Sequence, residues 1–171
     1  MMQLNHLDIA DQLEQTPKSL RQLLNNINDE LAQLKATENS WCVNEVIGHL
    51  IWADKYAFSD RISLMTQHDN SHLPQLDVNA AVKARQDHLK PLDSVLDEFE
   101  SIRSRNVAFI RRLDAATLRN SASYKDRVWL ASDFLFEWPF HDYGHIIQVM
   151  KILRGSLVPY MSETMRKAVG Y

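Results

Sequence analysis

Apolar side chains recur at three- and four-residue steps in four separate stretches of the chain, and this spacing predicts amphipathic helices. The first helix is expected to open at Thr16, a capping hydroxyl, with Pro17 at the first helical position. The last helix is expected to stop at Gly155. The four long helices predicted in this way cover residues 17–35, 43–66, 91–113 and 132–154.

The segments between these helices are shorter and more polar. Residues 67–79 are predicted to form a loop and residues 114–129 irregular chain, whereas Asn79 is expected to cap a short helix that ends near residue 90. The tail, 156–171, is given no assignment. Only four glycines and five prolines occur among 171 residues, too few for the tight turns of a β-rich fold. An all-α fold is therefore predicted.

Length and composition narrow the class of protein further. The length fits one domain, residues 1–171, with its core over roughly 10–155. A net charge of −3 and a pI near 6.1 disfavour nucleic-acid binding. Cys42 is the single cysteine, so no internal disulfide is expected, and no apolar run reaches the roughly 18 residues of a membrane span. The N-terminal residues do not resemble a signal peptide, so a soluble cytoplasmic protein is expected.

Two histidines four residues apart, His141 and His145, are the main candidates for chemistry. On a helix this spacing places both imidazoles on one face, one turn apart, where they can bind the same metal ion. His49, in another predicted helix, can reach the same ion in a bundle. Three neutral imidazoles with an open coordination position are typical of a catalytic metal site rather than a closed structural one.

A second pair, His68 and His72, has the same spacing but a different context. It lies in a polar stretch with a proline and no apolar periodicity, so it is predicted to belong to a loop. The helical neighbours of His141 are instead apolar, which places that imidazole in a packed interior. An unpaired buried polar group costs roughly 1–3 kcal/mol, so these imidazoles need a partner.

Several other polar residues lie close to the predicted site in sequence. Asp54 and Arg61 interrupt an apolar stripe, either as a partly buried ion pair or subunit contact, or as a polar wall of the site. Glu137 is either a solvated carboxylate or a group that orients an imidazole or completes the metal shell. Gln148 either hydrogen-bonds a ligand histidine or satisfies a backbone group. Cys42 is not expected to act as a nucleophile, because only the helix start lowers its pKa.

The order and spacing of these motifs resemble those of the DinB/YfiT-like superfamily of metalloenzymes. The resemblance covers roughly residues 10–155. The segments that carry it are Thr16-Pro17 with the leucines that follow, Trp41–Leu50, Leu73–Asp77, Glu98–Arg103 and His141–Gln148.

The resemblance implies an up-down-down-up four-helix bundle. It also implies a divalent transition metal, often nickel or zinc, held by His49, His141 and His145. Cys42 stands where the family usually has serine or threonine after the tryptophan, and sulfur is a weaker acceptor for capping a helix. Homodimers are common in the family.

Two functions follow from these observations. Relatives include transferases and an isomerase that use low-molecular-weight thiols, so the resemblance implies a metal-dependent enzyme acting on a small-molecule substrate with a thiol. The alternative is a non-catalytic metal-binding bundle with a structural or stress-related role. An open metal position at the floor of a pocket favours the enzyme, whereas a fourth protein ligand favours the alternative.

Overall fold

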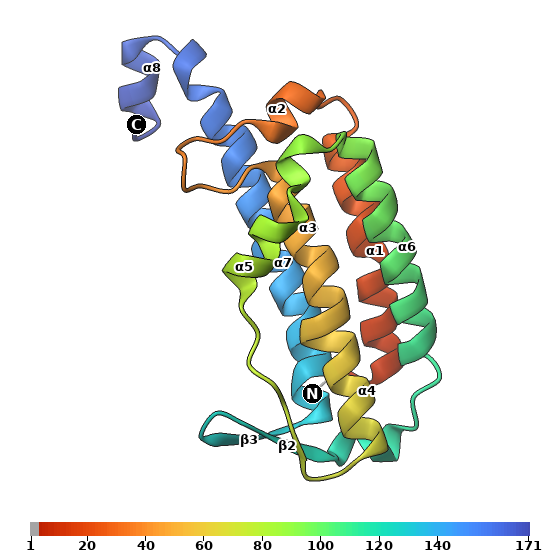
Figure 1. The fold of residues 1–171 in the computed structure, drawn as a ribbon. Coiled ribbons are helices and arrows are strands. Elements are labelled where there is room, and N and C mark those ends of the chain that lie inside the picture. Colours follow the sequence, from red (N-terminus) through yellow and green to blue (C-terminus); the bar gives the residue numbers. More distant parts are fainter. Residues whose placement is uncertain (1–3) are drawn as a thin grey trace.

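The computed structural model describes residues 4–171 and shows a bundle of four long helical columns (Figure 1). The first and last columns run in one direction and the two between them run in the other. The all-α fold predicted from the periodicity, and the up-down-down-up bundle implied by the family resemblance, are therefore confirmed. The columns are α1 (His6–Leu24); α3 (Val43–Trp52), continued by the π-helical segment η1 (Ala53–Ser59) and by α4 (Asp60–Gln67); α6 (Leu92–Ile110); and α7 (Ala131–Ser156).

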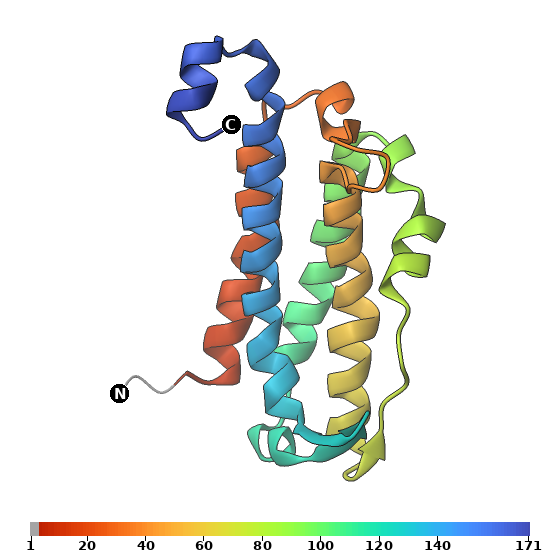
Figure 2. The ribbon, with the colours of Figure 1, turned by 90° about the vertical axis from the view of Figure 1, so that its left-hand side faces the viewer.

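Short elements connect the columns and close the two ends of the bundle. They are α2 (Asp29–Gln33), β1 (Ser71–His72), α5 (Val78–Arg85), η2 (Asp87–Leu89), η3 (Ala115–Arg119), β2 (Ser121–Tyr124), β3 (Arg127–Leu130), η4 (Val158–Tyr160) and α8 (Glu163–Ala168). β2 pairs antiparallel with β3 and parallel with β1, in the order β1-β2-β3. The β2–β3 hairpin lies at the end where α1 begins, and α2 and α8 lie at the other end (Figure 2).

The core lies along the axis of the bundle, where α1 and α3 each pack against both α6 and α7. One buried cluster, around Phe58 and Trp138, lies towards the hairpin, and their rings stack with centroids 5.0 Å apart. The other cluster centres on Ile47 and Phe99. Each fully buried side chain of this size contributes roughly 1.5–3 kcal/mol. The apolar stripes that predicted the four long helices face one another in this core.

The predicted start of the first helix is wrong. α1 begins well before Thr16, at His6, after a capping box in which the Asn5 side chain accepts from backbone N–H groups and Asp8 accepts from the Asn5 N–H. Pro17 is buried inside the helix.

Pro17 leaves one helical hydrogen bond unmade. Proline has no N–H, so the carbonyl of Leu13 lacks its helical donor. Arg103 of α6 donates to that carbonyl instead, at 3.0 Å. The helix therefore continues through the proline, and the Leu13 carbonyl that lost its helical donor is satisfied by a neighbouring column.

Other predicted boundaries also differ from the structure. The first column ends at Leu24 rather than near residue 35, and α2 follows as a separate helix. Asp77, not Asn79, caps α5, because its carboxylate accepts from the Ala80 N–H at 3.0 Å. α7 continues through Gly155 to Ser156. The segment predicted as irregular, 114–129, contains η3, β2 and most of β3.

The second column is not a regular α-helix throughout. Seven residues, Ala53–Ser59, form π-helical turns, and the N–H of Asp60 bonds to the carbonyl of Lys55 five residues back. Asp54 and Phe58, both in these turns, are buried, at 1% and 3% exposure. Such segments occur frequently beside functional sites.

Gly48 allows the chain before α6 to approach α3 closely. A Cβ at this position would overlap the carboxylate of Asp87, which is fully buried and paired with Lys90. The side chain of Asn44 donates to the Lys90 carbonyl at 2.8 Å in the same contact. The α5–η2 segment is thereby fixed against the helix that carries His49.

Candidate metal centre

Three imidazoles meet between α3 and α7. The Nε2 atom of His141 lies 3.0 Å from Nε2 of His49 and 3.2 Å from Nε2 of His145. One metal-ligating atom from each histidine lies within 4.8 Å of the others. His141 and His145 of α7 therefore form one cluster with His49 of α3.

The tautomer of His145 is set by Gln148, one turn further along α7. Nδ1 of His145 lies 2.8 Å from the amide oxygen of Gln148, so Nδ1 carries the hydrogen and donates it. The Nε2 lone pair of His145 is therefore free to bind a metal. Of the two roles open for Gln148, the contact to a candidate ligand is the one that the structure shows.

All three imidazoles are held towards the neutral form that a metal requires. Burial, reinforced by His145, lowers the pKa of His49 and of His141 to about 3. Burial also lowers the pKa of His145, although Gln148 opposes the shift. A neutral imidazole has a ring nitrogen with a free lone pair, which is the form that binds a metal ion.

The donor set fits a divalent transition metal. Ligand nitrogens about 2.0–2.1 Å from a tetrahedral ion lie about 3.3 Å apart, close to the separations found here. The group contains three protein donors, and no fourth carboxylate, thiol or imidazole of residues 4–171 joins it. Three neutral nitrogens suit zinc, nickel, iron or copper, with a position left for an exchangeable ligand.

Aromatic rings enclose the histidines. The ring centroid of Trp41 lies 5.2 Å from that of His49, and the ring of Trp52 stacks on His49 at 6.0 Å. Phe58 meets His141 edge-on at 5.2 Å. These walls keep the imidazole rings in position and exclude water from much of their surface.

A buried charged cluster lies behind His141. Asp142 follows it in α7 and accepts from Arg103 of α6 at 2.6 Å, and Arg103 also pairs with Asp54 of η1 at 2.6 Å. All three charged side chains are at most 1% exposed. Trp138 donates its indole N–H to Asp54 at 2.8 Å. Asp54 is therefore half of a buried ion pair, but its partner is Arg103 rather than another residue of its own column.

The charges in this cluster support one another. Burial raises the pKa of Asp54, against the opposing effect of Arg103. Burial alone would lower the pKa of Arg103, but Asp142 and Asp54 hold it well above its ordinary value. Arg103 also contributes to the lowered pKa of His141. The cluster thus joins the candidate metal centre to the packing of all four columns.

Sequence reasoning missed Arg103. Its position was visible, because it follows Phe99 by four residues and precedes Asn106 by three, which places it on the inner face of the helix. An arginine on an apolar face indicates a buried acidic partner. Asp54 and Asp142 supply that partner from two other columns.

A small cavity of about 160 Å³ opens beside the histidines. His49 and His141 line it, together with Arg61 and Glu137. Partial burial raises the pKa of Glu137, and the charge of Arg61 counteracts that shift. Arg61 is therefore part of the polar wall, whereas Glu137 is an exposed carboxylate at the edge of the cavity and does not belong to the group of metal-type donors.

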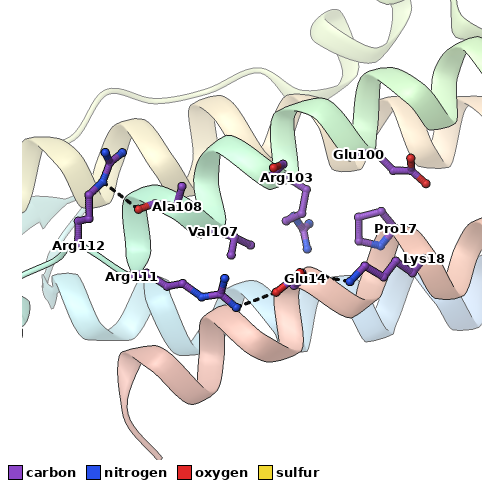
Figure 3. A pocket seen from close by; sticks show the side chains of 10 residues that line it. Glu14, Pro17, Lys18, Glu100, Arg103, Val107, Ala108, Arg111 and Arg112 are labelled. Atoms are coloured by element: carbon purple, nitrogen blue, oxygen red, sulfur yellow. Dashed lines mark hydrogen bonds and ion pairs between the residues drawn. The ribbon is translucent and has the colours of Figure 1, made fainter.

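Two of the larger cavities of the fold also bear on the choice of site. One, of about 610 Å³, lies between α1 and α6, and Figure 3 shows Arg111 and Lys18 paired with Glu14 there. Its lining contains no histidine. The other, of about 700 Å³ and largely apolar, is lined by Trp41 and Gln148, which are two of the residues that contact the histidines.

The remaining sequence candidates lie away from the centre. His72 contacts the Ser123 hydroxyl at 3.0 Å, and neither His68 nor His72 joins a metal-type cluster in the part of the chain described. Cys42 precedes α3 and is fully buried. Its N–H donates to the carboxylate of Glu45 at 3.0 Å, as in a capping box at the start of α3.

The fold and the site together define an up-down-down-up helical bundle with a three-histidine candidate metal centre. A sequence model of the DinB superfamily matches residues 12–149, which is most of the chain. The chain belongs to the DinB superfamily.

A solved structure supports the same fold. YfiT from Bacillus subtilis, described as a probable metal-dependent hydrolase with an unusual four-helix bundle topology, is similar with a TM-score of 0.79. The match covers 91% of this chain and 90% of YfiT at 16% identity, so it shows a shared fold. No curated protein matches the chain. No helix of residues 4–171 is both long and apolar enough to cross a membrane.

Proposed function

We propose that this protein is a metal-dependent enzyme that brings a low-molecular-weight thiol to a small electrophilic substrate, as a transferase or isomerase. His49, His141 and His145 would hold the ion, nickel or zinc. The observation that carries the proposal is the convergence of three neutral Nε2 atoms with no fourth donor from residues 4–171 in their group. Such a set leaves a position for an exchangeable ligand.

When bound, a divalent metal lowers the pKa of a ligand thiol and so favours the nucleophilic thiolate. The chain's own residues prepare the site. Gln148 keeps the Nε2 lone pair of His145 available, and Trp41 and Trp52 restrict the His49 ring. In a transfer, the thiol sulfur forms a bond to the electrophilic carbon, and the leaving group and the thiol proton depart.

Two cavities favour a reaction of two substrates. The small cavity is lined by His49 and His141, and the larger apolar cavity is lined by Trp41 and Gln148, which contact the histidine cluster. A thiol and an electrophile can therefore approach from separate cavities. A hydrolase needs only one organic substrate and water.

Hydrolysis is the second candidate, favoured by the structural similarity to YfiT and its description as a probable metal-dependent hydrolase. The same three imidazoles can hold an ion that acts as a Lewis acid on water. A bundle with a purely structural metal is the third outcome.

The test uses cobalt-loaded protein, because cobalt reports its ligands by visible absorption. Adding small thiols should change the spectrum, and the protein should accelerate displacement of chloride from chlorodinitrobenzene by those thiols. Faster hydrolysis of a nitrophenyl ester, with no spectral response to thiols, would favour the hydrolase. If the protein accelerates neither reaction and thiols do not change the spectrum, the non-catalytic bundle is the reading that remains.

We also propose a homodimer formed through α7. Five exposed apolar side chains follow one another along this helix at steps of four and three residues, which is the spacing of a helix–helix seam. A second copy of α7 presents the matching stripe. These residues are Phe136, Phe140, Tyr143, Ile147 and Met150.

The seam is tested by light scattering after gel filtration. Phe140 is 77% exposed, so Phe140→Asp should keep the fold but convert a dimer to a monomer. Leu89→Asp, at a 67% exposed position off α7, is the matched control and should stay dimeric. A wild-type monomer would contradict the proposal.

A further inference from the structure

Arg61 is a buried cation with few partners. It lies on α4, is 9% exposed and lines the 160 Å³ cavity that also touches His49 and His141. Its Nη2 donates to the Pro74 carbonyl at 3.3 Å. Its Nε is buried and has no hydrogen-bond partner. A guanidinium carries five N–H donors, so most of its bonding capacity is unused by the protein.

Other arginines of the fold differ from Arg61 because their side chains form ion pairs with carboxylates. Arg103 pairs with two carboxylates, and Arg85 pairs with Asp87 and Glu98. Among residues 4–171, the arginines that form ion pairs are Arg21, Arg85, Arg103 and Arg111, and Arg61 forms none. A buried charge without a paired carboxylate is costly, which makes Arg61 exceptional in this fold.

The surroundings of Arg61 hold the side chain in place while leaving donors free. Its guanidinium carbon lies 4.5 Å from the ring centroid of Tyr124 and 5.4 Å from that of Phe134. Tyr124 and Glu137 also line the cavity. Aromatic rings stabilise the cation through their faces but do not satisfy its N–H groups. The cavity therefore contains a fixed positive group with unused donors.

We propose that Arg61 binds the carboxylate of a small anionic substrate whose other end reaches the histidines. A planar guanidinium matches a carboxylate with two parallel hydrogen bonds. The cavity is smaller than the roughly 300–1,000 Å³ of drug-sized ligand sites, so the substrate it fits is a compact carboxylate. The reaction of this substrate rests on the proposed function. The binding of its carboxylate to Arg61 does not depend on that function.

The first experiment tests anion binding without any need for turnover. In the zinc-loaded full-length protein, which is diamagnetic, the Nε–H of Arg61 should give a slowly exchanging nitrogen-15 NMR signal, identified by its absence from Arg61→Lys. Propionate should shift this signal in a saturable way, whereas propan-1-ol should not. Equal effects of the two compounds, or no shift by propionate up to about 50 mM, the range of very weak binding, would overturn the proposal.

The second experiment connects Arg61 to the histidines. Cobalt-loaded protein is titrated with 3-mercaptopropionate and with 3-mercaptopropan-1-ol, which differ only in the carboxylate. The wild type should bind the anionic thiol about tenfold more tightly, because a charge-assisted hydrogen bond is lost with the alcohol. Arg61→Gln should remove this preference and leave the affinity for the alcohol unchanged. Arg112→Gln, at an exposed arginine on the cavity between α1 and α6, is the control and should keep the preference.

The outcomes separate the two proposals. No spectral change with either thiol, together with a propionate shift at Arg61, would contradict the thiol chemistry and support the anion site. Spectral changes of equal affinity for both thiols in the wild type would support thiol binding and contradict the role of Arg61.

Discussion

Nη2 of Arg103 lies 2.6 Å from Oδ1 of Asp54, and the pair is buried where the columns of the bundle meet. The same guanidinium reaches Asp142 of α7 and the carbonyl of Leu13 in α1. That carbonyl is free because Pro17 has no N–H to donate to it. One side chain of α6 therefore bonds to each of the other three columns.

Removing this arginine should strongly destabilise the protein. Arg103→Met keeps a side chain of similar length but leaves two buried carboxylates without their cation. Breaking a buried pair in this way costs about 3–5 kcal/mol, which urea unfolding would measure. Arg111→Met is the control, because Arg111 follows the same helix in an exposed pair and should change stability little. Equal stability of both variants would contradict the structural role of the cluster.

The three histidines should each be needed for metal. Purified protein is expected to carry about one divalent transition metal per chain, and His49→Ala, His141→Ala and His145→Ala should each lose most of it, because two imidazoles bind far more weakly than three. Elemental analysis gives the content. The paired variant His68→Ala with His72→Ala should keep its metal, and full occupancy in all the single variants would rule out the site.

Gln148 should tune the affinity of the site without supplying a ligand. Gln148→Leu removes the acceptor that orients His145, so metal affinity should fall about 10- to 100-fold. Competition with a coloured chelator measures the change. Gln148→Glu retains an acceptor at the same distance along the side chain and should recover most of the affinity. Unchanged affinity in Gln148→Leu would mean that the contact does not support metal binding.

The repeating features of this chain could be predicted from sequence, and the single long-range contacts could not. Periodicity in residues 91–113 and 132–154 predicted α6 and α7 closely, and the i, i+4 spacing of His141 and His145 predicted one shared face. Both depend only on the geometry of one helix. The meeting with His49 depended on the family resemblance, because spacing cannot say which helices are neighbours.

The wrong boundary at Pro17 has a physical explanation. Proline is common at the first turn of a helix, so Thr16-Pro17 indicated a start. The buried residues Ile9 and Leu13 continue the same stripe before it, however, and α1 keeps its helical form through the proline. The arginine that uses the freed carbonyl lies 90 residues away in sequence. The local preferences of the residues around Pro17 carry no information about a hydrogen-bond partner so far away in the sequence.

Cys42 should be unreactive in the folded protein. The thiol is fully buried, and burial raises its pKa from the ordinary 9.0 to about 11. At pH 8 only about a thousandth of it would be thiolate, the form that reacts. Because the unfolded thiol ionises more readily, the contribution of this group to stability is complete below pH 9.0 and is lost as pH rises towards about 11.

The measurement is alkylation by iodoacetamide followed by mass spectrometry. Labelling of the native protein at pH 8 should be slower by orders of magnitude than labelling in urea, and it should accelerate as pH rises towards about 11. Cys42→Ser is the matched control for labelling at other side chains and should take up no reagent at this position. Rapid native labelling at pH 8 would contradict the burial of Cys42 and would admit it as a nucleophile. Slow native labelling is the outcome expected of a thiol that is enclosed in the core beside α3.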